Sequence, residues 1–253
     1  MKLKTIVQRV HLWAGLLLGV QVLLWMASGV VMSIFPIELV RGETSTFVSE
    51  PIALDAAAYA SPGGIIAQAE GVTSVELRRF MGRPVYLATW PGGAAAMYDA
   101  QSGEKITPLK EAQARKVAEQ DYVGAGKIIS AALMTHPPHE YRGATPVWRM
   151  DLDDRLHTRI YVSPDTGEVR ARRNDIWRVY DFFWALHIMD YDERTNFNSW
   201  WLQLFAASGF VFALSGIIIV IYRLRRGRYG NDLKLAAGAK PRKPVASSEQ
   251  VRE

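Results

Sequence analysis

Residues 177–226 read WRVYDFFWALHIMDYDERTNFNSWWLQLFAASGFVFALSGIIIVIYRLRR, and this stretch decides the fold. It contains no charged residue between Arg194 and Arg223. At about 1.5 Å per helical residue, that run is longer than the roughly 30 Å hydrocarbon core of a bilayer. We therefore predict a transmembrane helix over residues 199–222, followed by a cluster of arginines.

An aromatic stripe precedes the apolar run. Its members are spaced three or four positions apart, and they are Trp177, Tyr180, Trp184, His187 and Tyr191. This spacing places them on one side of a helix, and a wide aromatic face suits a helix that lies at a membrane surface. We predict an interfacial amphipathic helix and linker over residues 175–198. His187 is then either an interfacial aromatic residue or a ligand.

The N-terminal segment, MKLKTIVQRVHLWAGLLLGVQVLLWMASGVVMSIF, is a second apolar run. It begins with basic residues and stays uncharged from Val10 to Ile37. A signal peptide has a shorter apolar core with a small-residue cleavage site just after it, and this segment has neither. We predict that residues 1–11 form a cytoplasmic N-terminal segment and that residues 12–35 form a retained transmembrane helix.

The mouth of this first helix carries His11, with Gly15 and Gly19 on the same face. In one interpretation the glycines form a helix–helix contact and His11 is a polar residue at headgroup level. In the other, His11 ligates a haem iron and the glycines make room for the porphyrin. Spacing alone favours the first, because small-residue pairs are common in membrane helices. Helices that touch at the glycines also leave no space between them for a porphyrin at that level.

Basic residues gather at both ends of the chain and supply much of its net charge of +5. Positive charge close to helix ends favours the cytoplasmic side, so both termini are predicted to be cytoplasmic and the intervening domain periplasmic. The expected location is the inner membrane of a Gram-negative bacterium, in contact with lipid and not with nucleic acid. Residues 223–253 are predicted to form a basic, disordered cytoplasmic tail that rests on anionic lipid.

The sequence contains no cysteine. This excludes disulfides, thiolate metal sites, iron–sulfur clusters and covalently attached c-type haem. Any cofactor must therefore be held by histidine, methionine, oxygen ligands or packing.

Residues 36–174 have mixed charge, turn-forming prolines and glycines, and short alternating runs typical of strands, which predict an α+β domain. The predicted elements are two strands within 75–87 joined around Met81 and Gly82, a strand over 94–99, and helices over 109–121 and 124–134. The first of these helices is amphipathic, and its expected inward residues are Leu109, Ala112, Val117 and Ala118.

The domain contains an internal repeat. PVYLATWPGGAAAMYDAQSGEKI, from Pro84, is similar to PVWRMDLDDRLHTRIYVSPDTGEVR, from Pro146. Both copies have Pro-Val-aromatic, a short hairpin, a tyrosine, and then a hydroxyl residue followed by Gly-Glu. Gly103 and Gly167 are predicted to take positive φ in tight turns. We infer two copies of one small α+β unit, over about 48–108 and 109–173.

The segment THPPHE, residues 135–140, is a candidate metal site. Two imidazoles, from His136 and His139, and the carboxylate of Glu140 suit zinc or iron. The two prolines between the histidines prevent regular helix, so the histidines cannot share a helical face. A loop with solvated histidines is the favoured interpretation.

Two further groups of polar residues are expected at the surface and not in a functional site. The carboxylates of Asp151, Asp153 and Asp154 are expected at a hairpin tip, where acidic turn residues are common. His157 is expected on the exposed face of the sheet.

The second repeat copy and the two apolar segments resemble a known protein family. The second repeat copy is similar to the PepSY module, which ends in a tyrosine-containing strand followed by Thr-Gly-Glu. RVHLWAGLLLGVQVLLWMASG, which ends in Ser28-Gly29, resembles the first helix of PepSY-associated transmembrane proteins. FFWALHIMDY and FVFALSGIIIVIYR, with Ser215-Gly216, resemble their later helix. The implied fold is two transmembrane helices flanking a periplasmic domain of two PepSY-like α+β units.

The resemblance implies a cofactor. Some members of this family are ferric-siderophore reductases that carry b-type haem between histidines at helix ends, and others are linked to iron uptake. His11 and His187 match these positions and are candidate haem b ligands, with Trp184 as a neighbouring cofactor contact. The reductase-like members have more membrane helices than the two predicted here. His11 and His187 are expected on opposite membrane faces, so the missing ligands must come from a homodimer or another membrane subunit.

The expected function follows from what is present and what is missing. The sequence has no Gly-rich dinucleotide fingerprint, phosphate loop, serine elbow or paired-histidine zinc helix, so no flavin or nicotinamide site is expected. An electron-donor protein must then supply the electrons to a haem electron-transfer or ferric-reductase-like component. The alternative is a non-catalytic periplasmic binding or regulatory module, or an accessory subunit of a membrane enzyme. Whether the chain is an enzyme stays open.

Overall fold

The computed structural model describes residues 3–46, 59–196 and 198–225, so the predicted tail lies almost entirely outside the described residues. The chain divides into two compact units. One, here called the helical unit, comprises Met1–Val30 with Trp184–Glu253, and the other, the sheet unit, comprises Val31–Phe183.

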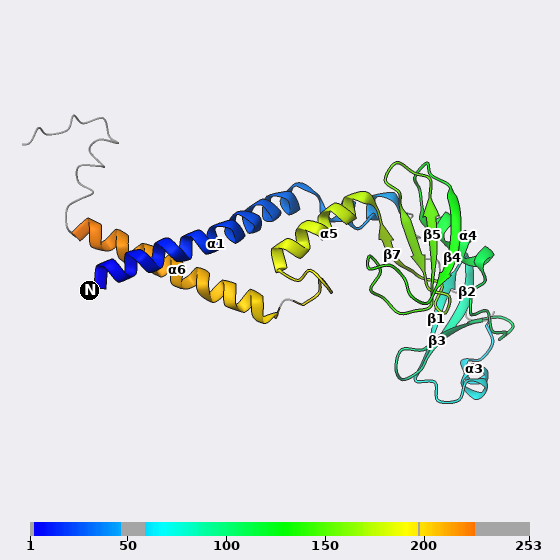
Figure 1. Ribbon diagram of the computed structural model, residues 1–253. Helices are drawn as coiled ribbons and strands as arrows, with labels where there is room; N and C mark the ends of the chain where they lie inside the picture. Colours follow the sequence, from blue (N-terminus) through cyan, green and yellow to red (C-terminus); the bar gives the residue numbers. More distant parts are fainter. Residues whose placement is uncertain (1–2, 47–58, 197, 226–253) are drawn as a thin grey trace, which may run out of the picture. The chain divides into compact units, whose positions relative to one another are not determined.

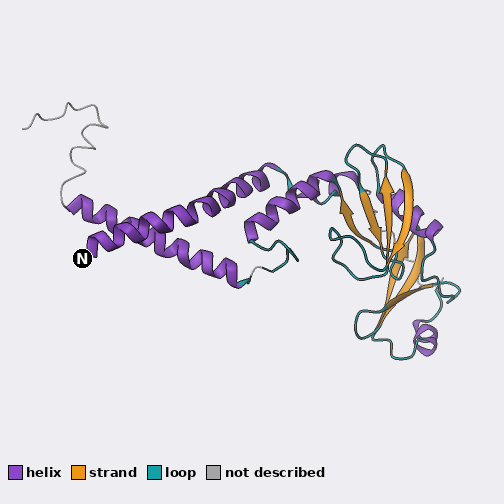
Figure 2. Ribbon diagram, in the orientation of Figure 1, coloured by secondary structure: helices purple, strands orange, loops and turns teal. Residues whose placement is uncertain are grey.

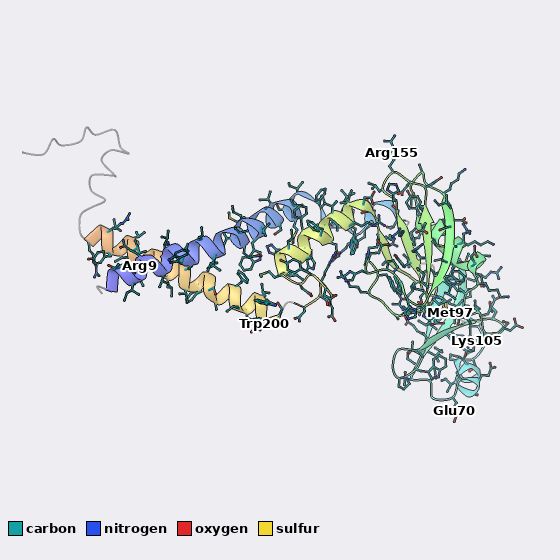
Figure 3. All side chains as sticks on the ribbon, viewed as in Figure 1. Arg9, Glu70, Met97, Lys105, Arg155 and Trp200 are labelled. Atoms are coloured by element: carbon teal, nitrogen blue, oxygen red, sulfur yellow. The ribbon has the colours of Figure 1, made fainter. Side chains whose placement is uncertain are left out.

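Two long apolar helices dominate the helical unit and lie side by side (Figure 1). Helix α1 spans Leu3–Ile34 and helix α6 spans Trp200–Arg225. An 18-residue window within Thr5–Ile34 has a mean hydropathy of 2.0 and one within α6 has 2.5, so both helices are long and apolar enough to cross a membrane. Arg9 and Trp200 lie at opposite ends of this helix pair (Figure 3).

Helix α5, Asp175–Ile188, carries the aromatic stripe. Its start is fixed by Asn174, whose side-chain oxygen accepts a hydrogen bond of 2.7 Å from the Trp177 backbone N–H. The helix ends at Ile188, within the range of 175–198 predicted for helix and linker. The sequence pattern therefore located this helix correctly.

The sheet unit contains two antiparallel sheets (Figure 2). The first has the order β1-β2-β3, formed by Ser74–Phe80, Arg83–Thr89 and Ala95–Asp99. The second has the order β4-β5-β6-β7, formed by Ile128–Met134, Val147–Leu152, Arg159–Val162 and Val169–Arg173. The remaining elements are α2 (Ile37–Val40), a 3₁₀ turn η1 (Glu43–Ser45), α3 (Pro62–Gln68) and α4 (Glu111–Asp121). This arrangement confirms the predicted fold class of terminal apolar helices around an α+β region.

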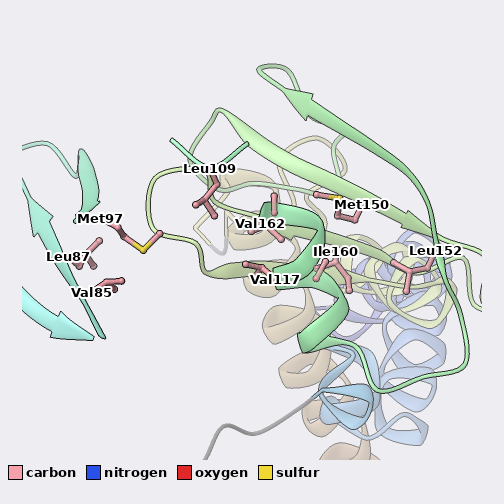
Figure 4. Close-up of a cluster of buried hydrophobic side chains, with 11 residues drawn as sticks. Val85, Leu87, Met97, Leu109, Val117, Met150, Leu152, Ile160 and Val162 are labelled. Carbon is pink, nitrogen blue, oxygen red and sulfur yellow. The ribbon is translucent and has the colours of Figure 1, made fainter. Parts of the chain in front are cut away.

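A continuous hydrophobic core joins the two sheets (Figure 4). Side chains alternate between the two faces of a strand, so Val85 and Leu87 of β2 point into this core while Tyr86 and Ala88 point to the opposite face. Helix α4 covers the core, which consists of Val85, Leu87, Met97, Leu109, Ala114, Val117, Ala118, Met150, Leu152, Ile160 and Val162.

The repeat appears as two identical turns. The N–H of Gly103 donates to the carbonyl of Asp99, and that of Gly167 donates to the carbonyl of Ser163. Their φ values are 75° and 66°, as predicted. A non-glycine residue at such φ values would be strained, which explains the Gly-Glu pair at both positions.

The predicted helix over 124–134 is wrong, because Ile128–Met134 forms strand β4. Ala131 pairs with Met150 of β5, and the pairing continues to Met134. Two nearby glycines, Gly124 and Gly126, disfavour a helix at the start of the segment. A short apolar run does not distinguish a strand from a helix. Here the pairing with β5 makes the segment a strand.

Three smaller predictions also need correction. Ala112 is exposed on α4, and Ala114 takes its place in the core. His157 is not on a strand but in a turn with φ 47°, where Nδ1 lies 2.7 Å from the Asp175 carboxylate. Asp151 belongs to β5, where it pairs with Ser130, and is not at a hairpin tip.

Candidate functional site

The helices α1 and α6 are in contact at Gly15. A Cβ atom on this glycine would lie 2.9 Å from Cε2 of Phe212, which is closer than real Cβ contacts allow. Gly15 therefore lets the Phe212 ring approach the α1 backbone, and a porphyrin has no space between the helices at this level. Gly19 differs, since no atom lies within 4 Å of the position of its Cβ.

His11 is held by α6. Its Nδ1 atom lies 2.6 Å from Oγ of Ser215, and its ring stacks on Phe212 with centroids 4.3 Å apart and planes 5° apart. The next residue, Gly216, lies directly against the ring, because a Cβ there would be 3.1 Å from Cε1 of His11. Ser215, Gly216 and Phe212 of α6 thus form the contact surface for His11 of α1.

His187 is held in the same way by α1. Its Nδ1 atom lies 3.1 Å from Oγ of Ser28, a serine that is fully buried. A Cβ on the following residue, Gly29, would lie 3.8 Å from Cε1 of His187. A Ser-Gly pair of α6 therefore contacts the histidine of α1, and a Ser-Gly pair of α1 contacts the histidine of α5. Sequence reasoning noted both Ser-Gly pairs only as parts of the resemblance and did not pair them with the histidines.

The two histidines lie far apart. Ser28 follows His11 by 17 positions on α1, which corresponds to about 25 Å along the helix. Because His187 is bonded to Ser28, it lies near the opposite end of the helical unit from His11. The two imidazoles cannot share one metal ion. Trp184, one turn before His187, donates its indole N–H to the carbonyl of Arg194 at 3.1 Å.

An apolar groove of about 500 Å³ lies beside His11. Its lining residues are His11, Leu12, Trp13, Gly15, Leu16 and Phe212. Leu12 and Leu16 are 70% and 67% exposed, so the groove opens on the outer surface of the helix pair. Its volume lies within the range of small-molecule and cofactor sites, which are mostly apolar with a few polar groups.

Each of these positions offers one imidazole, a donor that haem iron takes from histidine. In both histidines the Nδ1 atom is hydrogen-bonded to a serine hydroxyl. Neither histidine makes a further hydrogen bond to any of the described residues. A ring held at Nδ1 presents Nε2, and a ligating histidine commonly has its second nitrogen bonded in this way. A haem at His11 would have to occupy the outer groove, since Phe212 closes the space against Gly15.

The THPPHE loop gains no third ligand from Glu140. The Glu140 side chain is 9% exposed and accepts bonds of 2.9 Å from Arg159, 2.9 Å from Arg178 and 2.7 Å from the hydroxyl of Tyr161. His136 lies beside Thr135, with Nδ1 at 3.1 Å from Oγ1. No group of three His, Cys, Asp or Glu residues able to hold a metal occurs in the described part of the chain.

Glu140 is instead the centre of an ion-pair network in the sheet unit. Burial by itself raises the pKa of Glu140, but the hydrogen bonds from Tyr161, Arg159 and Arg178 outweigh it and hold the pKa below its ordinary value. Tyr161 is fully buried, and burial together with the Glu140 carboxylate raises the pKa of its hydroxyl. This network fixes the loop between β4 and β5.

Comparison with known proteins gives one match. A family model described as PepSY-associated TM region matches residues 8–245. No curated protein and no solved structure matches the chain. The matched range includes both apolar helices, the sheet unit, both histidines and both Ser-Gly pairs.

Proposed function

The chain belongs to the PepSY-associated TM region family, and from this membership we propose that it is a membrane-bound electron-transfer component that holds b-type haem at His11 and His187. One observation carries the proposal. Each histidine is hydrogen-bonded through Nδ1 to a buried serine of a neighbouring helix, with Nε2 left for a ligand. A ferric-reductase-like role linked to iron uptake is the specific form that we favour.

The residues around His11 have distinct tasks in this proposal. Haem, when bound, supplies reversible one-electron chemistry at its iron. The imidazole of His11 supplies a neutral nitrogen ligand, and Ser215 and Phe212 hold its ring in place. The open apolar groove would place apolar side chains against a flat, largely apolar ring system. At the other site, His187 would be the ligand and Ser28 would hold its ring through a hydrogen bond. Trp184 lies one helical turn from His187.

The second ligand at each site must come from outside this helix pair. His11 and Ser28, the partner of His187, are about 25 Å apart along α1, so each site has one imidazole. A homodimer with its axis along the membrane normal would bring His11 to His11 and His187 to His187. Another membrane subunit with suitable histidines would serve equally. Electrons would then come from a separate donor protein, because the sequence has no dinucleotide fingerprint.

The orientation of the chain is part of the proposal. Basic residues at the N-terminus and after α6 favour cytoplasmic termini, and the sheet unit would then be periplasmic in a bacterial inner membrane. Exposed leucines on α1, among them Leu16 and Leu17 at 67% and 75%, would face lipid. Haem sites at the two ends of the helical unit would lie near opposite membrane surfaces.

A haem titration of the purified full-length chain in detergent tests the ligands. We expect a Soret band that reaches two haems per dimer, and His11→Ala and His187→Ala should each remove about half of it. His136→Ala and His139→Ala are matched controls, since both lie in the THPPHE loop, and should change nothing. No Soret band after reconstitution, or spectra unchanged in both ligand variants, would overturn the proposal.

A second candidate function is peptide binding by the sheet unit. Strand β4 is an edge strand of its sheet, carries no charge, and exposes Ile129 and Leu133 at 67% and 51%. Such an edge can accept an added strand from an extended peptide. If this is the function, the chain should be colourless and copurify with a partner, and Ile129→Lys with Leu133→Lys should release that partner.

A further inference from the structure

The hydroxyl groups of Ser28 and Ser215 each have a backbone carbonyl of their own helix within hydrogen-bond distance. Ser28 donates to the carbonyl of Trp25 at 2.9 Å, and Ser215 donates to the carbonyl of Phe212 at 2.7 Å. A serine hydroxyl has one hydrogen and can otherwise only accept. When that hydrogen is directed to the backbone carbonyl, the serine oxygen can only accept a hydrogen bond, and the partner within reach is the Nδ1–H of its histidine.

This geometry selects one tautomer of each neutral imidazole. With the hydrogen on Nδ1, the lone pair of His11 and of His187 lies on Nε2. The opposite tautomer would place two acceptors, Nδ1 and the serine oxygen, against each other unless the serine turned its hydrogen away from the backbone carbonyl. Within an apolar helix pair, where few other donors are available, that arrangement is costly.

The glycine after each serine allows the histidine to reach this position. A Cβ at Gly216 would lie 3.1 Å from Cε1 of His11, so a side chain there would push the ring away from Ser215. Gly29 is less restrictive, with 3.8 Å to Cε1 of His187. The serine sets the hydrogen-bond direction, and the glycine provides the space.

We propose that Ser28-Gly29 and Ser215-Gly216 are positioning pairs that hold His187 and His11 as the Nδ1–H tautomer, with Nε2 presented to an iron-centred ligand. The choice of ligand rests on the proposed function. The tautomer does not, because the serine contacts are made by the chain itself. Neither serine is a ligand or touches the reacting group.

The chain offers a matched control. Ser208-Gly209 lies seven positions before Ser215-Gly216, on the same face of α6. Ser208 makes no side-chain hydrogen bond to the residues that the structure describes, and no atom lies within 4 Å of a Cβ placed on Gly209. A Ser-Gly pair without a histidine is thus available in the same helix.

The test is ¹⁵N NMR of the histidine side chains in the cofactor-free, full-length protein in detergent. Wild-type His11 and His187 should both show the Nδ1–H tautomer. Ser215→Ala should raise the Nε2–H population of His11 alone, and Ser28→Ala that of His187 alone. Ser28→Thr and Ser215→Thr keep the hydroxyl and should retain the wild-type tautomer, and Ser208→Ala should have no effect.

A predominance of Nε2–H in the wild-type protein overturns the positioning role without any variant. So does an unchanged tautomer in both alanine variants. After haem loading, the alanine variants should bind haem about tenfold more weakly and the threonine variants normally. If the tautomers respond but no haem binds, the proposed function fails and the positioning stands. If haem binds but the tautomers do not respond, the positioning fails and the function stands.

Discussion

The two glycines that follow the paired serines differ in how closely a histidine ring approaches them. A methyl group on Gly216 would meet His11 Cε1 at 3.1 Å, whereas one on Gly29 would meet His187 Cε1 at an ordinary 3.8 Å. Alanine is favoured over glycine in a helix by about 1 kcal/mol, so only a steric conflict makes the substitution unfavourable.

We therefore expect Gly216→Ala to lower the thermal stability of the full-length protein in detergent, and to weaken haem binding at His11. Gly29→Ala should be neutral or stabilising. Gly209→Ala, which meets no neighbour within 4 Å, is the control and should also be neutral or stabilising. Equal effects at Gly216 and Gly209 would show that the His11 ring does not rest on Gly216.

Glu140 makes the stability of the sheet unit sensitive to acid. Its pKa in the folded state lies below the ordinary value of 4.5, so the unfolded state takes up a proton first as the pH falls. The stabilisation is complete above about pH 4.5 and is lost as the pH falls through the folded-state pKa.

Glu140→Gln should cost about 1.5–3 kcal/mol at neutral pH, because it removes charged hydrogen bonds to two arginines. It should also flatten the dependence of the melting temperature on pH between about 5 and 3. Glu119→Gln, on the exposed side of α4, is the control. Parallel pH curves for wild type and Glu140→Gln would contradict the assigned role.

The conformation or contacts of a single residue were predictable where neighbouring residues in the sequence determine them. They were not predictable where a residue far away in the sequence determines them. Gly103 and Gly167 take positive φ because the turn itself requires it. The partner of His11 depends on which helix α1 contacts and at what level, and Ser215 is 204 positions away in sequence. The ion pairs of Glu140 were likewise not predictable, because sequence spacing does not show that arginines from β6 and α5 reach it.

Among the helices and strands, strongly periodic or long apolar segments were located correctly, and the short apolar segment 124–134 was not. Strand β4 consists of IISAALM, in which alanine, leucine and methionine suit a helix. Its pairing with β5 overrides that preference. The long runs of α1 and α6 had no such competitor, since in hydrocarbon only a helix satisfies every backbone group within the segment.

The contact between α1 and α6 is open to a direct test at Gly15. Gly15→Leu should destabilise the helix pair by about 1–3 kcal/mol, because the side chain would overlap Phe212. Gly19→Leu, with no atom within 4 Å of its Cβ position, should be tolerated. Adding Phe212→Ala to Gly15→Leu should recover part of the loss. Unfolding of the purified protein in denaturing detergent measures all three, and equal losses at both glycines would argue against this contact.

The topology of the whole molecule can be determined because the chain has no cysteine, so a single introduced cysteine is the only thiol. Ala94→Cys, in an exposed turn of the sheet unit, should react with a membrane-impermeant maleimide in intact cells. Ser247→Cys, in the C-terminal tail, should react only after permeabilisation. The reverse pattern would place the sheet unit in the cytoplasm.

Haem binding by the full-length chain is tested most directly by a reduced-minus-oxidised absorption difference spectrum of the protein purified from haem-supplied cells. We expect b-type bands in the wild type, about half of their intensity in His11→Ala and in His187→Ala, and none in the double variant. A featureless difference spectrum from the wild-type protein, persisting after haem reconstitution, would contradict an electron-transfer role for the two histidines.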